Sequence, residues 1–560
     1  MLRSLVDQNV LRYDTDRRCW SCDIETIWRQ GFTDKILILL STRLSNLPSS
    51  LQICLKVAST FGISLSEDVV TSFGKTKEYS NMKDEFHKAV ASGYMEEYST
   101  GAYKFVHDSV REASYNLIKL DERDQFHCKI GMELLQVYNA ECQEDVDSSI
   151  LLPIADQLCH NNLGGRFDLA ELLNKAAKKA MATSDFERAQ RYLTQARTLI
   201  PEDQLWGDHY DFAMQLYLSL GQAAFSSGHI ELAKSSWNQV IENGRTLESK
   251  LDAYYLSHRL LHHLGQTEQA YKGSLQVLSE LKERMPRAGS VDQQDMIATF
   301  NRIEEKMNNN DTLVSMNEVS DQHYYRLQQF LSQAAFLAYY RRDSLLPYLI
   351  ARLVEISLDH GVSKYSANGF AYASFMLSIY KKMRQANRYG KVALDLLARF
   401  EDSSQLIHVY LSYYGFVGAI FEPIQLAAER LHTGLGVGQS IGDVTTALLS
   451  GLMYVQKSFV AGNNLSCLLE DVNSLLKLSQ IHKHKRTVAY LSSYHQTISQ
   501  LINKEFIESK LVDECIDDPM MKLEGFQASV YFHRIVASFL VGREYVCVCV
   551  CIKSLKLAVC

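Results

Sequence analysis

The apolar residues in the middle of the chain recur with the spacing of amphipathic α-helices. Residues 169–181 carry leucine and alanine at intervals of three and four positions, and residues 186–200 repeat this spacing with larger side chains. Between them lies Thr183-Ser184-Asp185, a run of small polar residues that suits a tight turn and a helix N-cap. The pattern therefore predicts two helices joined as a hairpin.

The first turn of the second helix then recurs further along the chain. The residues at 184–189 have counterparts at 228–233 and 265–270, and each of the three stretches ends in an alanine small enough for close helix contact. These alanines are 44 and 37 positions apart, near the period of about 34 residues of tetratricopeptide repeats. Repeats of this kind bury their apolar faces by stacking and leave a long concave surface. We therefore predict tetratricopeptide-like repeats over residues 146–285.

The pattern weakens after the third repeat and then returns. Residues 286–321 are polar, include Pro286 and a run of asparagines at 308–310, and are predicted to form a linker or irregular helices. Helical hairpins resume near Gln322 and form a second helical-repeat region over residues 322–545. Its turns are marked by Asp359-His360-Gly361, Gly442-Asp443 and Gly462-Asn463-Asn464.

The first part of the chain has a different order of elements. Residues 51–61, 66–73 and 82–92 have helical patterns, and residues 94–98 and 103–106 flank a Ser-Thr-Gly turn as in a β-hairpin. Three helices followed by a hairpin is the order of a winged-helix module, which we assign to residues 47–145. The third helix begins Met-Lys-Asp-Glu-Phe-His-Lys, mixed in sign, so packing is favoured over DNA reading. The predicted fold class is mainly α: a winged-helix module followed by a tetratricopeptide-like α-solenoid of helical hairpins.

Composition supports this assignment and narrows the possible partners. The chain has 560 residues, enough for three or four domains or one long repeat array. It contains 7 prolines, where average usage of about 5% would give about 28, and proline breaks helix interiors. With 58 basic and 65 acidic residues the net charge is −7, which supplies no field for neutralising phosphates. The composition therefore disfavours nucleic-acid binding.

Targeting and redox signals are weak. The N-terminus lacks the apolar stretch of a secretory signal, and the longest apolar runs are too short to cross a bilayer. We expect a soluble, cytoplasmic protein whose twelve cysteines are mostly free, buried thiols. Cys19-Trp20-Ser21-Cys22 is a lone CxxC without a second pair, so a short turn is favoured over a zinc or redox site.

Gly74-Lys75-Thr76 matches only the end of a phosphate-binding loop, G-x-x-x-x-G-K-[ST]. The first glycine of that motif would fall at Val69, and a helix rather than a strand precedes the loop. Without the glycines the backbone cannot wrap a phosphate, and no Mg²⁺-binding strand motif follows. We therefore expect no ATP hydrolysis by this chain alone.

Two histidine patterns also favour structural roles. Asp108 is predicted to cap the helix over residues 109–118 while His107 packs at the end of the preceding strand, since no nucleophile or oxyanion site accompanies them. His258 and His262 stand at i and i+4, but Arg259 breaks the HExxH signature, so a solvated or partly buried histidine face is favoured.

The thirty tyrosines mostly fall at helical spacing, as at Tyr254, Tyr255 and Tyr271, which is typical of a core. We assign no catalytic, cofactor-binding or metal-binding residue.

The stretch Phe105-Val106-His107-Asp108-Ser109-Val110-Arg111-Glu112-Ala113-Ser114-Tyr115 resembles a family motif, F-x-H-D-x-V-x-x-A-A-Y. This motif follows the ATPase domain in large signalling proteins that join an AAA/STAND-type predicted ATPase to a sensor histidine kinase or a serine/threonine kinase. Four other stretches resemble the same family in the same order. Residues 11–14 with 20–27 resemble its ATPase lid, residues 33–48 its lid-to-winged-helix junction, residues 154–158 its V-x-D-Q-L-N element, and residues 360–367 its H-G-x-S-x-x-S-A motif.

The departures from this family bear on function. Family members place a P-loop and a Walker B strand before the lid and usually continue into sensor and kinase domains, whereas this chain begins at the lid and stops after the helices. Residues 1–46 are therefore read as a remnant of the lid. The anomalous tail, residues 546–560, opens with alternating valine and cysteine, as a GT dinucleotide repeat translates. Intron read-through is favoured there over a short edge strand.

The resemblance implies a non-catalytic signalling scaffold, the protein-binding and transmission region of a multidomain AAA/STAND ATPase–kinase. Its partner would be another protein or the ATPase or kinase domain of the same molecule, with no cofactor, no membrane and no small-molecule substrate identified. Side chains on the first helix of each pair, such as Tyr217 and Tyr254, are expected to line the binding face. One alternative is a fragment of an active ATPase or sensor kinase, and a second is a winged-helix transcription regulator with a helical sensor.

Overall fold

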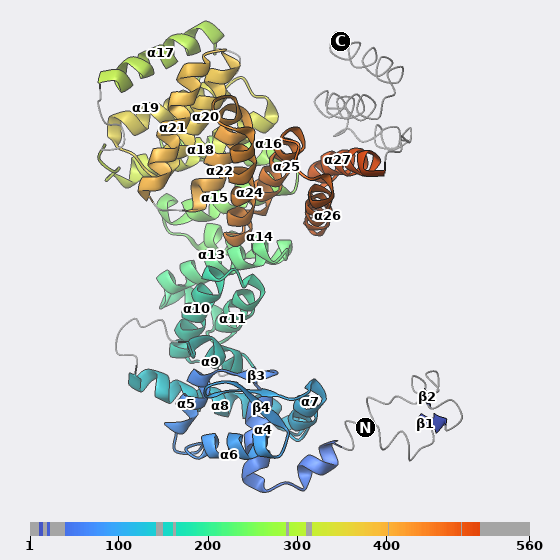
Figure 1. Cartoon of the computed structure of the whole chain (residues 1–560). Coiled ribbons are helices and arrows are strands. Elements are labelled where there is room, and N and C mark those ends of the chain that lie inside the picture. The colour runs from blue at the N-terminus through green and yellow to red at the C-terminus, as the bar shows by residue number, and fades with distance from the viewer. Residues whose placement is uncertain are drawn as a thin grey trace. The chain divides into compact units, whose positions relative to one another are not determined.

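The computed structural model of the chain is mainly helical (Figure 1). It describes residues 11–14, 19–22, 40–141, 149–160, 164–286, 291–309, 316–400, 403–482 and 484–503. The anomalous tail at 546–560 and most of the predicted lid remnant lie outside the described residues. The chain divides into two compact units: unit 1 comprises residues 1–181 and 188–209, and unit 2 comprises residues 182–187 and 210–560.

In unit 1 the lone CxxC does not form the short turn that the sequence predicted. The strand β2 (Cys19–Cys22) pairs antiparallel with β1 (Leu11–Asp14), so that Leu11 lies opposite Cys22 and Asp14 opposite Cys19. The backbone of these four residues is extended because a partner strand a few residues upstream supplies its hydrogen bonds. The local sequence of the CxxC carries no sign of that partner.

Residues 49–105 of unit 1 form three helices and a small sheet at the predicted positions. The sheet is antiparallel with the order β3-β5-β4, and its hairpin turns at Gly101, which has a φ of +73°. Phe73, Phe86 and Phe105 are buried in its core, and the rings of Phe86 and Tyr103 stack 4.9 Å apart. The elements are α4 (Ser49–Ser59), β3 (Ser64–Leu65), α5 (Glu67–Gly74), α6 (Met82–Ala91), β4 (Met95–Ser99) and β5 (Ala102–Phe105).

Further helices complete unit 1. The predicted hairpin over residues 169–200 is present as α10 (Phe167–Ala182) and α11 (Phe186–Thr198), and the turn between them places Ser184 at a φ of +62°. The other elements are α7 (Asp108–Asn116), a 3₁₀ turn (Leu120–Glu122), α8 (Arg123–Glu141), α9 (Leu151–Leu158) and α12 (Glu202–Gly207).

Unit 2 is an array of helical hairpins. In each hairpin the first helix contacts the second and also the first helix of the next hairpin, so α13, α15, α18, α20, α22, α25 and α27 form one continuous row. We call this row the first-helix row. Its members are α13 (Tyr210–Ser226), α15 (Leu247–His263), α18 (Gln322–Arg341), α20 (Lys364–Ile379), α22 (Leu406–Tyr413), α25 (Val444–Val460) and α27 (Lys485–Asn503).

The second helices pack outside this row. They are α14 (Ile230–Asn243), α16 (Thr267–Glu280), α19 (Leu346–His360), α21 (Met383–Phe400), α24 (Ile424–Ser440) and α26 (Leu465–Ile481). Between α22 and α24 the chain makes a π-helical turn (Tyr414–Gly418) and one short helix, α23 (Ala419–Phe421); a 3₁₀ turn (Ser403–Gln405) precedes α22.

Much of the predicted linker over residues 286–321 is a regular helix. Helix α17 (Gln293–Asn309) packs on α19 and buries Phe300, Ile303 and Met307. Those positions follow helical spacing, and the polar residues around them hid the pattern in the sequence. The linker alternative is therefore wrong for residues 293–309, while residues 310 and 311 of the asparagine-rich run lie outside the described residues.

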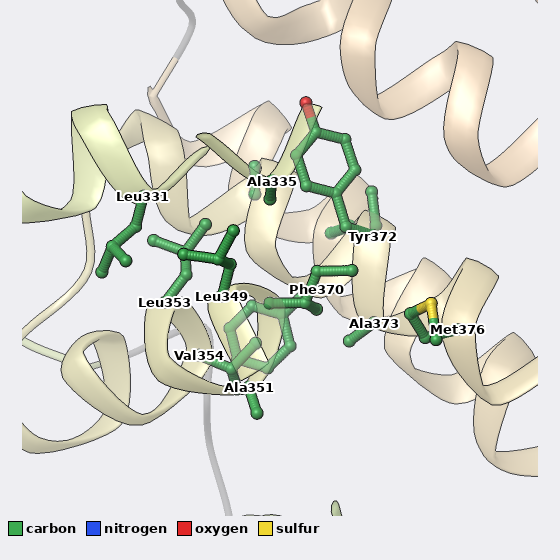
Figure 2. Packing of buried hydrophobic residues seen from close by; sticks show 14 of the residues in the cluster. Leu331, Ala335, Leu349, Ala351, Leu353, Val354, Phe370, Tyr372, Ala373 and Met376 are labelled. Atoms are coloured by element: carbon green, nitrogen blue, oxygen red, sulfur yellow. The ribbon is translucent and has the colours of Figure 1, made fainter. Parts of the chain in front are cut away.

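The core of unit 2 lies between successive helices. Figure 2 shows Phe370 of α20 among Leu349 and Val354 of α19, all of them buried. Tyr372, two positions further along α20, points its hydroxyl away from that cluster. Tyr372 nevertheless belongs to the same buried cluster, so helix α20 is buried on more than one side.

Candidate functional site

The family-like motifs of unit 1 meet in one chain of hydrogen bonds. The hydroxyl of Tyr115, at the end of the first motif, lies 3.0 Å from Nε2 of His127 on α8. Nδ1 of His127 lies 2.7 Å from Oε1 of Gln157, which belongs to the stretch at 154–158 that resembles V-x-D-Q-L-N. The Gln157 amide donates to the carbonyl of Thr60 at 3.1 Å. The motifs thus join α7, α8, α9 and α4, a structural role.

Asp156, beside Gln157, joins α9 to α11. Its carboxylate accepts hydrogen bonds from Arg188, from Arg191 at 2.5 Å and from the hydroxyl of Tyr192 at 2.8 Å. Because two guanidinium groups and a phenol share one carboxylate, this cluster fixes the packing of the two helices. No charge of the cluster is left without a partner for a ligand.

The helix cap lies one residue earlier than the sequence predicted, at His107 instead of Asp108. Nδ1 of His107 accepts the backbone N–H of Ser109 at 3.1 Å, so His107 is the N-cap, and its side chain is exposed rather than packed at the strand end. Asp108 is the first residue of α7 and pairs with Arg111 at 2.7 Å, which lowers the pKa of its carboxyl. Extended backbone at His107 makes it the N-cap, and the chain turns helical one residue earlier than predicted.

The motif at residues 360–367 is also a structural junction. Gly361 has a φ of +104°, and a Cβ there would lie 2.9 Å from the Asn317 carbonyl oxygen, so only glycine fits. Ser363 caps α20 in a capping box with Ser366, and Gln328 donates to the Gly361 carbonyl at 2.8 Å.

The phosphate-loop fragment has no loop geometry. Gly74 is the last residue of α5, and the Thr76 hydroxyl donates to the carbonyl of Phe73 at 2.8 Å and accepts the N–H of Tyr79 at 3.2 Å. The side chain of Thr76 is thus engaged in ending the helix.

The first-helix row of unit 2 carries two adjoining pockets that share Phe336 and Tyr372. The smaller, which we call the polar pocket, has a volume of about 40 Å³. Its polar lining comes from five members of the row or their caps: His258, Arg259, Gln333, Asn368, His408 and Asp443.

Asp443 organises the polar pocket. It is 4% exposed, its Oδ2 lies 2.9 Å from Nη2 of Arg259 and 3.2 Å from Nε2 of His408, and its Oδ1 caps α25 by accepting the N–H of Thr446. Burial alone would raise the pKa of Asp443, but the charge of Arg259 and these hydrogen bonds hold it far below its ordinary value. Asp443 is therefore an ionised carboxylate that ties α15, α22 and α25 together.

The sequence favoured a solvated or partly buried face for the histidines of α15, and the structure has His258 buried and His262 half-buried. His258 is 5% exposed and lies 3.1 Å from the hydroxyl of Ser274 and 3.4 Å from Oε1 of Gln333. His262 is half-buried and lies 3.0 Å from the hydroxyl of Thr267. Burial lowers the pKa of each to about 4, so both are neutral at pH 7. Each has its own protein partner, and they do not form a shared metal site.

The larger pocket, which we call the aromatic pocket, has a volume of about 310 Å³. Helix α18 supplies Phe336, Tyr339 and Tyr340, and the rings of Phe375, Phe416 and Tyr490 come from α20, the π-helical turn and α27. Tyr339 is 39% exposed, and its ring makes edge contacts with those of Tyr340, Phe375 and Phe416 within 6.4 Å. Tyr372 and Tyr494 also line the pocket. Its aliphatic and uncharged polar lining residues are Ala335, Leu346, Leu411, Ser412, Leu449, Leu452, Met453, Gln456 and Thr487.

Arg486 is the one charged side chain in the lining of the aromatic pocket. Its guanidinium lies 5.5 Å from the ring centre of Tyr340, a cation–π contact. No carboxylate of the described residues lies within ion-pair distance of it. The aromatic pocket therefore combines apolar rings with one half-buried cation that has no anionic partner in the described chain.

The two tyrosines that the sequence placed on the expected binding face line neither of these pockets. Tyr217 is 3% exposed in the core, and Tyr254 packs against the core and stacks on His258; neither lines a pocket. Tyr255, its neighbour, lines the polar pocket instead. Tyr271 is in the core, as predicted, and the paired aromatics Tyr339-Tyr340 were the sequence signal for the pocket.

The described residues also bear on metal sites, membrane-spanning helices and cysteines. Among its residues, no cluster of three or more His, Cys, Asp or Glu side chains has the geometry of a metal site. None of the described helices is both long and apolar enough to cross a bilayer. Cys54 is a buried free thiol as predicted and Cys128 is also buried, whereas Cys467 is exposed.

No protein-family model matches the chain. It is similar to "Hybrid signal transduction histidine kinase G" of Dictyostelium discoideum. The alignment is 588 positions long, has 20% identity and covers 88% of this chain. The chain spans 16% of the length of that relative.

Among solved structures, it matches a Signal Transduction ATPase with Numerous Domains (STAND) protein with a tetratricopeptide repeat sensor from Pyrococcus horikoshii. That match has a TM-score of 0.34 and 12% identity, and covers 84% of this chain and 62% of that one. The chain is thus a mainly helical protein with sequence similarity to a signal transduction kinase.

Proposed function

We propose that this chain is the protein-binding and transmission region of a multidomain signalling protein, itself without catalysis. One observation carries the proposal: seven consecutive first helices form one row, five of them line a common pocket, and three of these five contribute most of its aromatic side chains. Aromatic residues dominate the energetics of protein interfaces, and repeat arrays use such faces for binding. The similarity to a signal transduction histidine kinase over most of the chain supports a signalling context.

Within this proposal, residues 47–145 form a winged-helix module that packs rather than reads DNA. The element order of three helices and a hairpin supports the module. Helix α6 buries Met82, Phe86 and Ala89, and its Lys88 pairs with Glu85 at 2.7 Å. A helix with its basic residues balanced in this way offers little to a phosphate backbone.

The test is affinity capture from an extract of the source organism with three baits: the wild-type chain, Tyr339→Ser and Ile379→Ser. Tyr339 lies in the aromatic pocket, and Ile379 is 54% exposed at the end of α20 and lines neither pocket. We expect proteins captured by the wild type and by Ile379→Ser to be lost with Tyr339→Ser. Identical captured sets for all three baits would show that the aromatic pocket binds no protein.

A second candidate is that the natural product is a longer ATPase or sensor kinase of which this chain is a part. The observation that favours it is the coverage of the relative, of which this chain spans 16%. Sequencing the transcript across both ends tests it. A phosphate-binding loop upstream or a kinase domain downstream would support it, and stop codons on both sides would overturn it.

A further inference from the structure

We infer that the aromatic pocket of unit 2 is a binding site for a small amphipathic carboxylate, with an apolar body of one or two rings and an anionic group that pairs with Arg486. This inference goes beyond the proposed function, because it adds a small ligand inside the aromatic pocket to the protein partner that the proposal places on the face around it. It rests on the volume of the pocket, its lining and its unbalanced charge.

The volume fixes the size of the apolar body. An engineered cavity of about 150 Å³ in a protein core binds benzene, and the aromatic pocket is about twice as large at 310 Å³. Two fused rings or an equivalent aliphatic body therefore fit. Binding sites for small molecules begin at about this volume and share the mixture of aromatic walls with a few polar groups.

The charge of the pocket lining determines which polar group the ligand carries. Arg486 is half-buried over the Tyr340 ring and has no acidic partner in the described chain. A guanidinium binds a carboxylate through two parallel hydrogen bonds, and partial burial strengthens that pairing. The lining contains no acidic side chain, so a cationic ligand finds no partner there.

The neighbouring polar pocket shows by contrast how this chain treats a guanidinium that is structural. Arg259 is paired with Asp443 at 2.9 Å. Arg486 lies on the same row of helices, and the described protein supplies it with no equivalent carboxylate. The geometry thus leaves the anionic half of the pair to a ligand.

The experiment measures binding of 2-naphthoate to the full chain by calorimetry or by the fluorescence of the naphthalene ring. Its neutral isostere, 2-naphthamide, has the same apolar body without the charge. We expect 2-naphthoate to bind about tenfold more tightly than 2-naphthamide, the effect of one charge-assisted hydrogen-bond pair. Equal affinities, or no binding of either probe, would overturn the inference.

Variants test whether the site is the aromatic pocket. Arg486→Gln is expected to weaken 2-naphthoate about tenfold, to the level of the amide, and to leave the amide unchanged. Arg384→Gln removes an exposed arginine outside both pockets and is the matched control for net charge. If both variants weaken 2-naphthoate equally, the preference comes from overall charge and the inference is wrong.

Met453→Trp fills the pocket and is expected to abolish binding of both probes while the circular dichroism spectrum remains helical. Retained binding in this variant would place the probes elsewhere and overturn the inference. Failure of the ligand site remains distinguishable from failure of the proposed function. Absence of probe binding with intact, Tyr339-dependent protein capture would refute the small ligand and assign the pocket to a polypeptide.

Discussion

Two arginines on the first-helix row of unit 2 are treated in opposite ways. Arg259 is paired with the buried Asp443, which also binds His408 and caps α25. Arg486 lies on α27 of the same row, contacts the ring of Tyr340 and has no acidic partner in the described chain. A charge whose partner is buried with it holds helices together, whereas a charge exposed to an apolar pocket is available to something outside. The polar pocket around Arg259 and Asp443 is therefore the structural part of this face, and the aromatic pocket around Arg486 is the part that we infer to bind a ligand.

The largest expected effect comes from breaking the paired half. Asp443→Asn leaves Arg259 and His408 buried without a carboxylate and weakens the cap of α25. Removing one partner of a buried ion pair costs about 3–5 kcal/mol of the free energy of unfolding. Hydrogen exchange of peptides from α15 and α25 measures this loss locally. Arg384→Gln, an exposed charge change, is the control with an expected effect within about 0.5 kcal/mol.

If Asp443→Asn exchanges at the wild-type rate, the ion pair contributes nothing net to the stability of unit 2. Arg259 would then not be a stabilising charge, and it would no longer differ from Arg486 in this respect.

The next effect concerns the neutral histidine beside that ion pair. Burial lowers the pKa of His258 to about 4, below the ordinary value of about 6.5. Between these values the unfolded chain binds more protons than the folded one, so stability falls as the pH is lowered from 6.5 towards 4. The full loss for His258 is about 3 kcal/mol. Asp443 stays ionised in this window because its own pKa lies far below it.

Urea unfolding at pH 7.5 and at pH 5 checks this slope in the wild type and in two variants. His258→Gln is expected to reduce the pH dependence by the share of one buried histidine, because burial also lowers the pKa of His262, His263 and His484 to about 4. His229→Gln, which removes an exposed histidine of the same unit, is expected to leave the slope unchanged. An unchanged slope in His258→Gln would mean that His258 is not one of the groups that link acid to unfolding.

A smaller effect is expected at the equivalent cluster of unit 1. Asp156 accepts from Arg188, Arg191 and Tyr192, but its side chain is 29% exposed, so water can replace part of what is lost. We expect Asp156→Ala to lower the local free energy of unfolding by about 2 kcal/mol, the value of hydrogen bonds to a charged group. Hydrogen exchange of α9 and α11 measures it, with Asp168→Ala as a more exposed control. A loss as large as that of Asp443→Asn would show that exposure does not set the cost.

The helical hairpins could be predicted from the sequence because their signals are local. Apolar spacing placed α10 and α11 within a few residues of their true ends, and glycine turns marked where α14 and α16 begin. The failures came where the deciding partner lies elsewhere in the chain. Helix α17 is specified by its packing on α19, and the strand at Cys19–Cys22 by a hydrogen-bonded neighbour.

The binding site was harder to predict for the same reason. The row of first helices follows from the repeat, but which side of each helix meets the pocket depends on how far each hairpin rotates against the next. Tyr254 and Tyr255 are adjacent and both pack against the core, but only Tyr255 also lines a pocket. Arg486 has no motif, and its significance appears only when the absence of a neighbouring carboxylate in the described fold is known.

The smallest expected effect on stability is the one that most sharpens the comparison. Arg486→Gln removes a cation–π contact worth about 0.5–1 kcal/mol and no ion pair within the described residues, so the free energy of unfolding should change by less than about 1 kcal/mol. Added 2-naphthoate at ten times its dissociation constant should then stabilise the wild type by about 1.4 kcal/mol, because a ligand of the folded state shifts the unfolding equilibrium. The same concentration should stabilise Arg486→Gln by only about 0.4 kcal/mol, because it equals the dissociation constant of a variant that binds tenfold more weakly. If instead Arg486→Gln destabilises the chain as much as Asp443→Asn, Arg486 is a structural charge whose partner lies outside the described residues, and the two halves of the face are alike.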